Sequence, residues 1–155
     1  MTTYEELLTV ADQHDLQVKE HPLISHDGLI KGKRIAIRKT IPTQSAKSCV
    51  LAEELGHHCT TTGDILDQSN AANRKQELQA RTWAYNRMIG LMGIINAFEH
   101  GCKNLYETAA YLDVTEEFLQ AALQRYRQKY GVYTQLDNYI IYFEPNLGVM
   151  KRIQD

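Results

Sequence analysis

A helical repeat of small and apolar residues that carries two adjacent glutamates constrains this chain more than any other stretch. The repeat begins near Gln44, where Pro42-Thr43 stops a strand and offers an N-cap. Carboxylates on a largely buried helix are costly unless a cation or hydrogen bonds satisfy them. The fold must therefore supply partners for Glu53 and Glu54. The members that predict burial of this helix are Ala46, Cys49, Val50, Leu51, Ala52, Leu55 and Gly56.

The spacing of the polar residues on this helix is that of a metal-dependent hydrolase. Glu53 and His57 are four residues apart, so their side chains project from one helix face and can share a ligand. Glu54 lies about 100° further round, where it can reach a water held by that ligand. The segment reads E-E-x-x-H, one residue away from the H-E-x-x-H helix of zinc metallopeptidases. Glu53 and His57 are candidate metal ligands, and Glu54 is the candidate general base.

Other interpretations of these polar residues remain open from the sequence alone. Adjacent glutamates followed by histidine also occur on solvated helix faces that carry no chemistry. His58 follows His57 directly and therefore points about 100° away from it. It could be a spare ligand, a donor to a transition-state oxyanion, or a packing residue. The remaining histidines are not spaced as metal ligands would be, and we expect them to be surface or partly buried residues. They are His14, His21, His26 and His100.

The order of predicted elements indicates one α+β domain over residues 1–155. Two short apolar runs around a Gly-containing turn predict a β-hairpin, and Gly90 and Gly93 interrupt an otherwise long helical pattern. Thr115 followed by two glutamates is a good helix start. The expected elements are a helix over 3–14, the hairpin over 28–38, a helix from about 44, a helix over about 70–98, helices near 103–112 and 115–130, and strands over 139–143 and 149–151.

Composition and charge exclude several classes of protein. The 155 residues carry 17 Lys and Arg against 19 Asp and Glu, a net charge of −2, which gives no bulk attraction to nucleic acid or anionic membranes. No apolar run approaches the roughly 18 residues of a membrane span, and the acidic, amphipathic start is unlike a signal peptide. The 3 cysteines lack C-x-x-C spacing, which argues against a disulfide framework or a cysteine zinc site. We expect a cytoplasmic protein.

Two motifs, one on each of the first two long helices, carry a specific resemblance. The first is S-C-V-L-A-E-E-L-G-H-H over residues 48–58, close to the pattern L-A-H-E-L-G-H. The second is R-K-Q-E-L-Q-A-R-T-W-A over residues 74–84, close to E-x-x-A-x-x-F-A with Trp in place of Phe. A helix-turn-helix-like pair follows, with Asp113-Val114-Thr115 in its turn. Over most of residues 25–131 the chain resembles the ImmA/IrrE family of metallopeptidases, which occur in prophages and mobile elements.

The resemblance implies a zincin-like fold with a small sheet from the 28–38 hairpin, which C-terminal strands could join, packed on several helices. It implies that His57 and Glu77 are the second and third metal ligands and that Glu54 is the general base. Glu53 takes the position of the first ligand, where the family has histidine. The implied cofactor is zinc, and manganese or iron would compete better at this carboxylate-rich site than at a site with two histidines.

The implied activity is proteolysis of a specific protein partner, a helix-turn-helix repressor of a phage or mobile element. The glutamate at position 53 leaves an alternative, in which the chain keeps the fold, has lost the metal and acts as an antirepressor-type binding module. Direct DNA binding is not expected, because the basic and acidic residues of the helical pair cancel and its second helix opens with Glu116 and Glu117.

Overall fold

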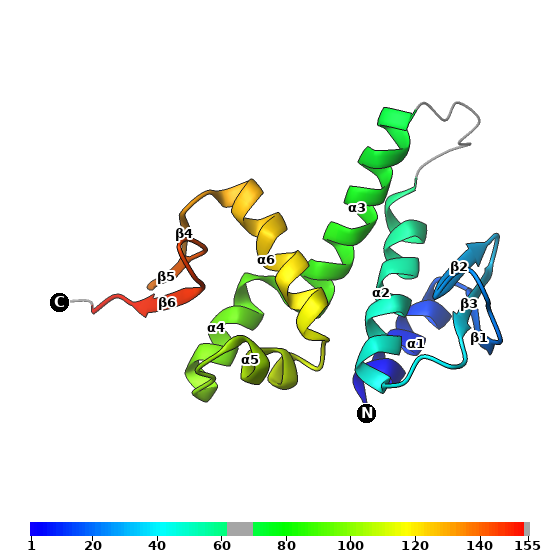
Figure 1. Cartoon of the computed structure of the whole chain (residues 1–155), viewed down its shortest axis with the longest axis horizontal. Helices are drawn as coiled ribbons and strands as arrows, with labels where there is room; N and C mark the ends of the chain where they lie inside the picture. The colour runs from blue at the N-terminus through cyan, green and yellow to red at the C-terminus, as the bar shows by residue number, and fades with distance from the viewer. Residues whose placement is uncertain (62–69, 154–155) are drawn as a thin grey trace. The chain divides into compact units, whose positions relative to one another are not determined.

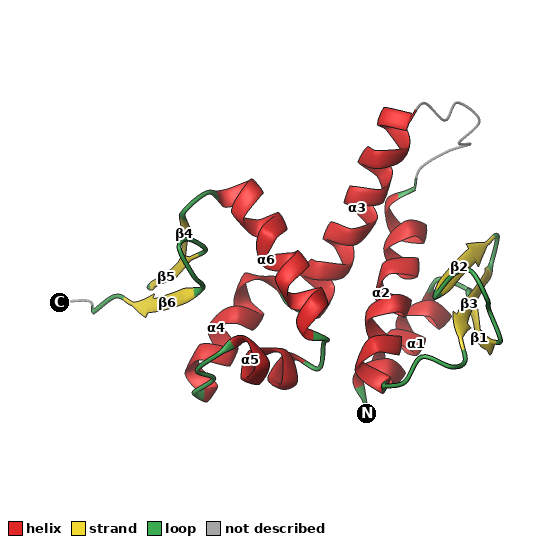
Figure 2. Cartoon of the chain, in the orientation of Figure 1, coloured by secondary structure: helices red, strands yellow, loops and turns green. Residues whose placement is uncertain are grey.

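The computed structural model describes residues 1–61 and 70–153, which contain six helices and two three-stranded sheets (Figures 1 and 2). This confirms the α+β class. The contacts of the chain divide it into two compact units, Met1–Arg87 and Met88–Asp155; whether the chain acts as one domain stays a prediction. Within the described residues, no helix is both long and apolar enough to cross a membrane.

The first unit contains a three-stranded sheet with strand order β1-β3-β2. The predicted hairpin is confirmed as the antiparallel pair β2 (Gly28–Lys31) and β3 (Arg34–Arg38), and Gly32 adopts a positive φ of 59° in its turn. The strand β1 (Gln17–His21) pairs in parallel with β3 and was not expected from the sequence. Strand β2 therefore forms one edge of the sheet.

The helix α2 (Gln44–Thr60) packs between this sheet and the helix α1 (Thr3–Gln13). Its predicted burial is confirmed, since Leu51, Ala52 and Leu55 are fully buried. Burial of these apolar side chains, together with Leu7, Ala11, Ile35 and Ile37 from the elements around them, forms the core of the first unit. The polar end of α2 is thereby fixed relative to the edge strand β2.

Thr43 is the N-cap of α2, as expected, because its Oγ1 accepts a hydrogen bond of 3.1 Å from the Ala46 amide. We expect Thr43→Ala to lower the free energy of unfolding by about 1 kcal/mol, since the substitution leaves that amide without its partner. Urea denaturation monitored by circular dichroism measures the change. Thr9→Ala, on the exposed face of α1, is the control and should be neutral or slightly stabilising, because alanine is the better helix former. An equal loss in both variants would contradict the capping role.

The prediction of a single helix over about 70–98 is wrong. The structure has α3 (Asn70–Met88) and then α4 (Gly90–His100). Gly90, the first residue of α4, has a positive φ of 64°, a left-handed conformation that interrupts a continuous right-handed helix. The helical periodicity of the sequence continues across this point because residues on both sides are buried, including Met88, Ile89 and Ile94.

The second unit contains the expected helical pair and a sheet of its own. The helices α5 (Leu105–Leu112) and α6 (Glu116–Tyr130) pack against each other, and Asp113 between them has a φ of 56°. The C-terminal strands do not join the hairpin sheet. They form a separate antiparallel sheet of β4 (Tyr133–Leu136), β5 (Tyr139–Tyr142) and β6 (Gly148–Lys151), in that order.

Candidate functional site

The candidate site lies where α2 and α3 touch. Gly56 of α2 faces the backbone of α3 so closely that a Cβ atom there would lie 2.2 Å from the carbonyl oxygen of Ala80. Only glycine permits this approach, because no real Cβ lies that near a backbone atom. The contact brings Glu77, one turn before Ala80, against the polar end of α2. The resemblance places the third ligand on this second helix, and the structure does bring that residue to the first motif.

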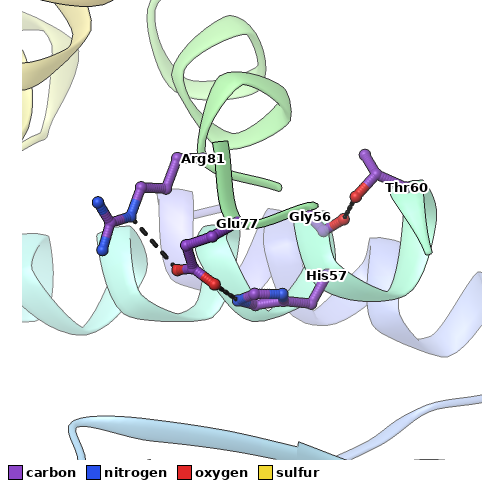
Figure 3. A network of polar contacts seen from close by, with 5 residues as sticks. All are labelled: Gly56, His57, Thr60, Glu77 and Arg81. Carbon is purple, nitrogen blue, oxygen red and sulfur yellow. Dashed lines mark hydrogen bonds and ion pairs between the residues drawn. The ribbon is translucent and has the colours of Figure 1, made fainter. Parts of the chain in front are cut away.

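Glu77 joins the two helices through a direct contact with His57. The His57 Nε2 atom lies 3.2 Å from Glu77 Oε2, and the Arg81 Nε atom lies 3.3 Å from Glu77 Oε1. Figure 3 shows the Glu77 carboxylate between the imidazole and the guanidinium. Each carboxylate oxygen thus has its own partner, and the contact fixes which oxygen faces α2.

Glu54 lies under the edge strand β2. A Cβ atom at Gly28 would be 3.0 Å from Glu54 Cγ and 2.7 Å from Val50 Cγ1, so the strand crosses the helix at this point. Burial, followed by the negative charges of Glu53 and Glu77, raises the pKa of Glu54 from 4.5 to about 7. The carboxyl group is therefore poised to exchange a proton near neutral pH.

Glu53 belongs to the same electrostatic group. Burial is the main cause that raises the pKa of its carboxyl group, and the charges of Glu77 and Asp27 raise this pKa further. Arg81 acts in the opposite direction and lowers the pKa. The charges of the three glutamates Glu53, Glu54 and Glu77 thus act on one another, and His57 joins them through its direct contact with Glu77.

The side chains fit a divalent cation by their chemistry. Carboxylate oxygen and imidazole nitrogen are zinc ligands. Burial, followed by the repulsion between carboxylates, raises the pKa of Glu53 and Glu54, and a dication would offset both effects. Within residues 1–61 and 70–153, no three His, Cys, Asp or Glu side chains are gathered closely enough to form a metal site. The structure brings together two of the three candidate ligands, His57 and Glu77, and leaves Glu53 one helical turn from His57.

Two residues of this group were missed by sequence reasoning. Arg81 and Tyr85 follow Glu77 at i+4 and i+8, so all three lie along one stripe of α3. Tyr85 is buried, and burial followed by the charge of Glu53 raises the pKa of its hydroxyl group. The i+4 spacing from Glu77 is the signal that could have found Arg81.

His58 lies apart from this group. Its ring contacts the His14 ring of α1 edge to face, with centroids 5.3 Å apart and an interplanar angle of 83°. Burial, followed by the positive charges of His14 and Lys33, lowers the pKa of His58. These contacts favour the packing role among the three roles that the sequence left open.

Comparison with known proteins gives one family. No curated protein and no solved structure matches the chain. A family model described as the IrrE N-terminal-like domain, Peptidase_M78, matches residues 7–124, well over half of the 155 residues. This span includes both helices of the candidate site and the helical pair that follows them. The chain therefore belongs to the IrrE N-terminal-like family of metallopeptidase-fold proteins.

Proposed function

We propose that this protein is a metal-dependent endopeptidase that acts on a specific protein partner. The observation that carries the proposal is the His57–Glu77 contact of 3.2 Å between α2 and α3, next to a glutamate whose pKa is about 7. A metallopeptidase needs ligands from separate elements and an adjacent carboxylate that can take a proton. Membership of the Peptidase_M78 family supports the same activity.

Glu53, His57 and Glu77 would hold the metal, which we take to be zinc, with manganese or iron as the other candidates. When bound, a divalent cation supplies Lewis acidity toward the scissile carbonyl and lowers the pKa of water in the site. The Glu77 Oε2 atom already faces His57. Glu53 lies on the same helix face as His57, one turn earlier, and would complete the set.

Glu54 would act as the general base. A carboxyl group with a pKa of about 7 is half ionised at neutral pH, close to the optimum for a group that must both accept and return a proton. Its carboxylate would take the proton from the attacking water and pass it to the leaving amine. Partial burial under β2 supports this role, because it is the main cause that raises the pKa of the carboxyl group.

The edge strand β2 is the surface we propose for the substrate. It lies at the end of the strand order β1-β3-β2, so its outer edge can pair with an extended peptide. Gly28 at the start of β2 lies over Glu54, so a paired peptide would pass beside the general base. We propose a helix-turn-helix repressor as the partner, and the reading frames next to this gene are the first place to look for it. Action in the cytoplasm follows from this assignment.

We expect the purified protein to bind about one equivalent of zinc or manganese, and His57→Ala and Glu77→Ala to weaken that binding by at least about 100-fold, since each removes a ligand. Isothermal titration calorimetry after treatment with a chelator measures the affinity. Glu117→Ala, at an exposed position on α6, is the matched control and should bind as the wild type does. Unchanged affinity in both site variants would contradict the ligand assignment.

One observation favours the alternative function, a catalytically inactive module that binds a repressor. Both oxygens of Glu77 have partners within the protein, and no three donors are gathered in the described part of the chain. The same titration separates the two functions. Failure to bind zinc, manganese or iron at any concentration, together with complex formation with an intact repressor, would establish the module and overturn the peptidase.

A further inference from the structure

The outer face of the first sheet carries a group of basic side chains. Residues 17–39, which contain this sheet, hold six lysines and arginines against two acidic residues, although the whole chain has 17 against 19. The helix α2 contacts β2 and β3 on the face that buries Ile35 and Ile37. The opposite face of the sheet is therefore the one that solvent reaches (Figure 1).

The strand register decides which side chains share this outer face. Directly paired residues project on the same side of a sheet, and neighbours along a strand project on opposite sides. The outer face therefore consists of the rows that alternate with the buried Ile35 and Ile37. These rows are Lys31–Arg34–Gln17, Leu29–Ala36–Lys19 and Arg38–His21. Every charged side chain in the three rows is basic.

The two acidic residues of the segment are engaged elsewhere. The Oε1 atom of Glu20 lies 2.6 Å from Nζ of Lys47 in α2, and Oδ1 of Asp27 lies 3.1 Å from Nη2 of Arg38. The cations of the outer face that have no ion pair in the described part of the chain are Lys19, Lys31 and Arg34.

Lys31 and Arg34 are direct cross-strand neighbours with the same charge. Like charges opposite each other destabilise a pair of strands, and here no carboxylate of the described residues offsets the repulsion. The simplest alternative is that lysine on an edge strand deters aggregation. That explanation accounts for Lys31 on the edge strand β2, but not for Arg34 on the central strand β3.

An extended peptide paired with the free edge of β2 would place every second side chain over this basic face. The peptide residues opposite Leu29 and Lys31 would lie on the outer face, two positions apart, while those opposite Gly28 and Ile30 would turn toward α2. Leu29 is 41% exposed. One outer side chain of the peptide would therefore meet an apolar surface, and the other would meet two cations.

We propose that the outer face of this sheet recognises substrate segments in which an acidic and an apolar residue stand two positions apart. Naming the peptide a substrate rests on the proposed function, whereas its docking on β2 requires neither metal nor cleavage. Nucleic acid is the other class of anionic partner, but a phosphate backbone makes no use of the exposed Leu29 between the cations. The observations therefore favour an acidic protein segment.

The test is the binding of two fluorescent peptides to the chelator-treated protein, measured by fluorescence anisotropy. One peptide is acetyl-Thr-Glu-Thr-Leu-Thr-Glu-Thr-Leu-amide, and the other has glutamine in place of each glutamate. We expect the glutamate peptide to bind about 5- to 10-fold more tightly at about 20 mM salt, since each exposed ion pair contributes modestly. At about 500 mM salt the preference should fall below about 2-fold, because salt screens exposed charges.

Lys31→Gln combined with Arg34→Gln should remove this preference, and each single substitution should lower it by about 2- to 3-fold. The melting temperature of the double variant should not fall, because the substitutions remove a like-charge repulsion. The matched control is Lys103→Gln combined with Lys129→Gln, at exposed positions of the second unit. It changes the net charge by the same amount and should retain the preference.

Equal binding of the two peptides at low salt, a preference that survives the double variant, or no binding of either peptide below about 1 mM would overturn the inference. A labelled DNA duplex that binds more tightly than the glutamate peptide, and no longer binds the double variant, would assign the face to nucleic acid instead. Metal titration and repressor cleavage are separate measurements. A glutamate preference in a protein that binds no metal would support this inference and overturn the peptidase, whereas cleavage with no preference would do the reverse.

Discussion

Glu54→Gln should lower the rate of repressor cleavage by about 10²- to 10⁴-fold and, in the same protein, raise the melting temperature at pH 8. The rate falls because glutamine cannot accept the proton of the attacking water, and loss of a general base has effects of this size. The stability rises because glutamine carries no charge in a site where burial and two neighbouring carboxylates oppose ionisation. Opposite effects on activity and stability are typical of a catalytic residue held in an unfavourable environment.

The sign of the stability effect follows from the direction of the pKa shift. The pKa of Glu54 is about 7 in the folded protein, against an ordinary value of 4.5 that also describes the unfolded chain. The folded state therefore holds the proton more tightly. Below pH 4.5 the carboxyl is protonated in both states and the protein has its full stability from this group. Stability then falls as the pH rises from 4.5 to 7, and the loss is complete above pH 7.

The size of this loss is limited by the partial exposure of Glu54. A rise from 4.5 to about 7 corresponds to at most about 3 kcal/mol, and solvent screening reduces this to about 1–2 kcal/mol. For a chain of this length, that amounts to about 3–6 °C. Differential scanning calorimetry of the metal-free proteins at pH 5 and pH 8 measures the effect, which should be present at pH 8 and small at pH 5.

Glu6→Gln, on the exposed face of α1, is the matched control and should change neither cleavage nor melting temperature. Cleavage is followed by mass spectrometry of the repressor after incubation with zinc-loaded protein. A Glu54→Gln variant that cleaves at the wild-type rate would contradict the general-base role. Reduced stability at pH 8 would contradict the electrostatic account of the site.

The elements that the sequence predicted well are those whose burial pattern follows from local residues. Thr43 and Thr115 both cap helices, as expected, because their hydroxyl groups serve amides within the same turn. The small and apolar repeat of α2 predicted a buried helix, and the pairing of β2 with β3 followed from a short turn. These predictions depend on contacts between residues close in the chain.

The elements that were missed depend on distant partners. The strand β1 exposes four of its five residues, so it shows no alternation, and only its pairing with β3 makes it a strand. Gly90 and Gly93 marked a possible break, but the sequence did not decide for it because the periodicity is the same for one buried helix and for two. The i,i+4 pair of Arg81 with Glu77 is local, but its place beside His57 depends on the approach of α3 to α2, which the sequence does not show.

The sequence predicted the helix α2 that carries the motif, but it did not predict the close approach of α2 to α3. Gly56 was counted among the small residues that favour burial, and nothing in the local sequence says that it must be glycine. The structure gives the reason, since Ala80 carbonyl oxygen occupies the place of a side chain. The position of Glu77 therefore depends on an atom that Gly56 does not have.

Gly56→Ala should lower the free energy of unfolding by about 2–3 kcal/mol and weaken metal binding by about 10- to 100-fold. The new Cβ would lie 2.2 Å from a backbone oxygen, so α2 and α3 must move apart, and overpacking against backbone has costs of this size. The same movement separates His57 from Glu77, whose contact is 3.2 Å, and displaced ligands lose affinity. Urea denaturation and zinc titration measure the two effects.

Gly93→Ala makes the comparison sharp, because it introduces the same methyl group at another helical glycine. The new Cβ in α4 would lie 3.3 Å from Leu112 Cδ2, the end of a flexible side chain that can move aside. Alanine then gains its helix propensity of up to about 1 kcal/mol over glycine, so this variant should be neutral or more stable and should bind metal normally. If Gly56→Ala behaved like Gly93→Ala, α2 and α3 would not be in backbone contact, and the crossing that places Glu77 beside His57 would be wrong.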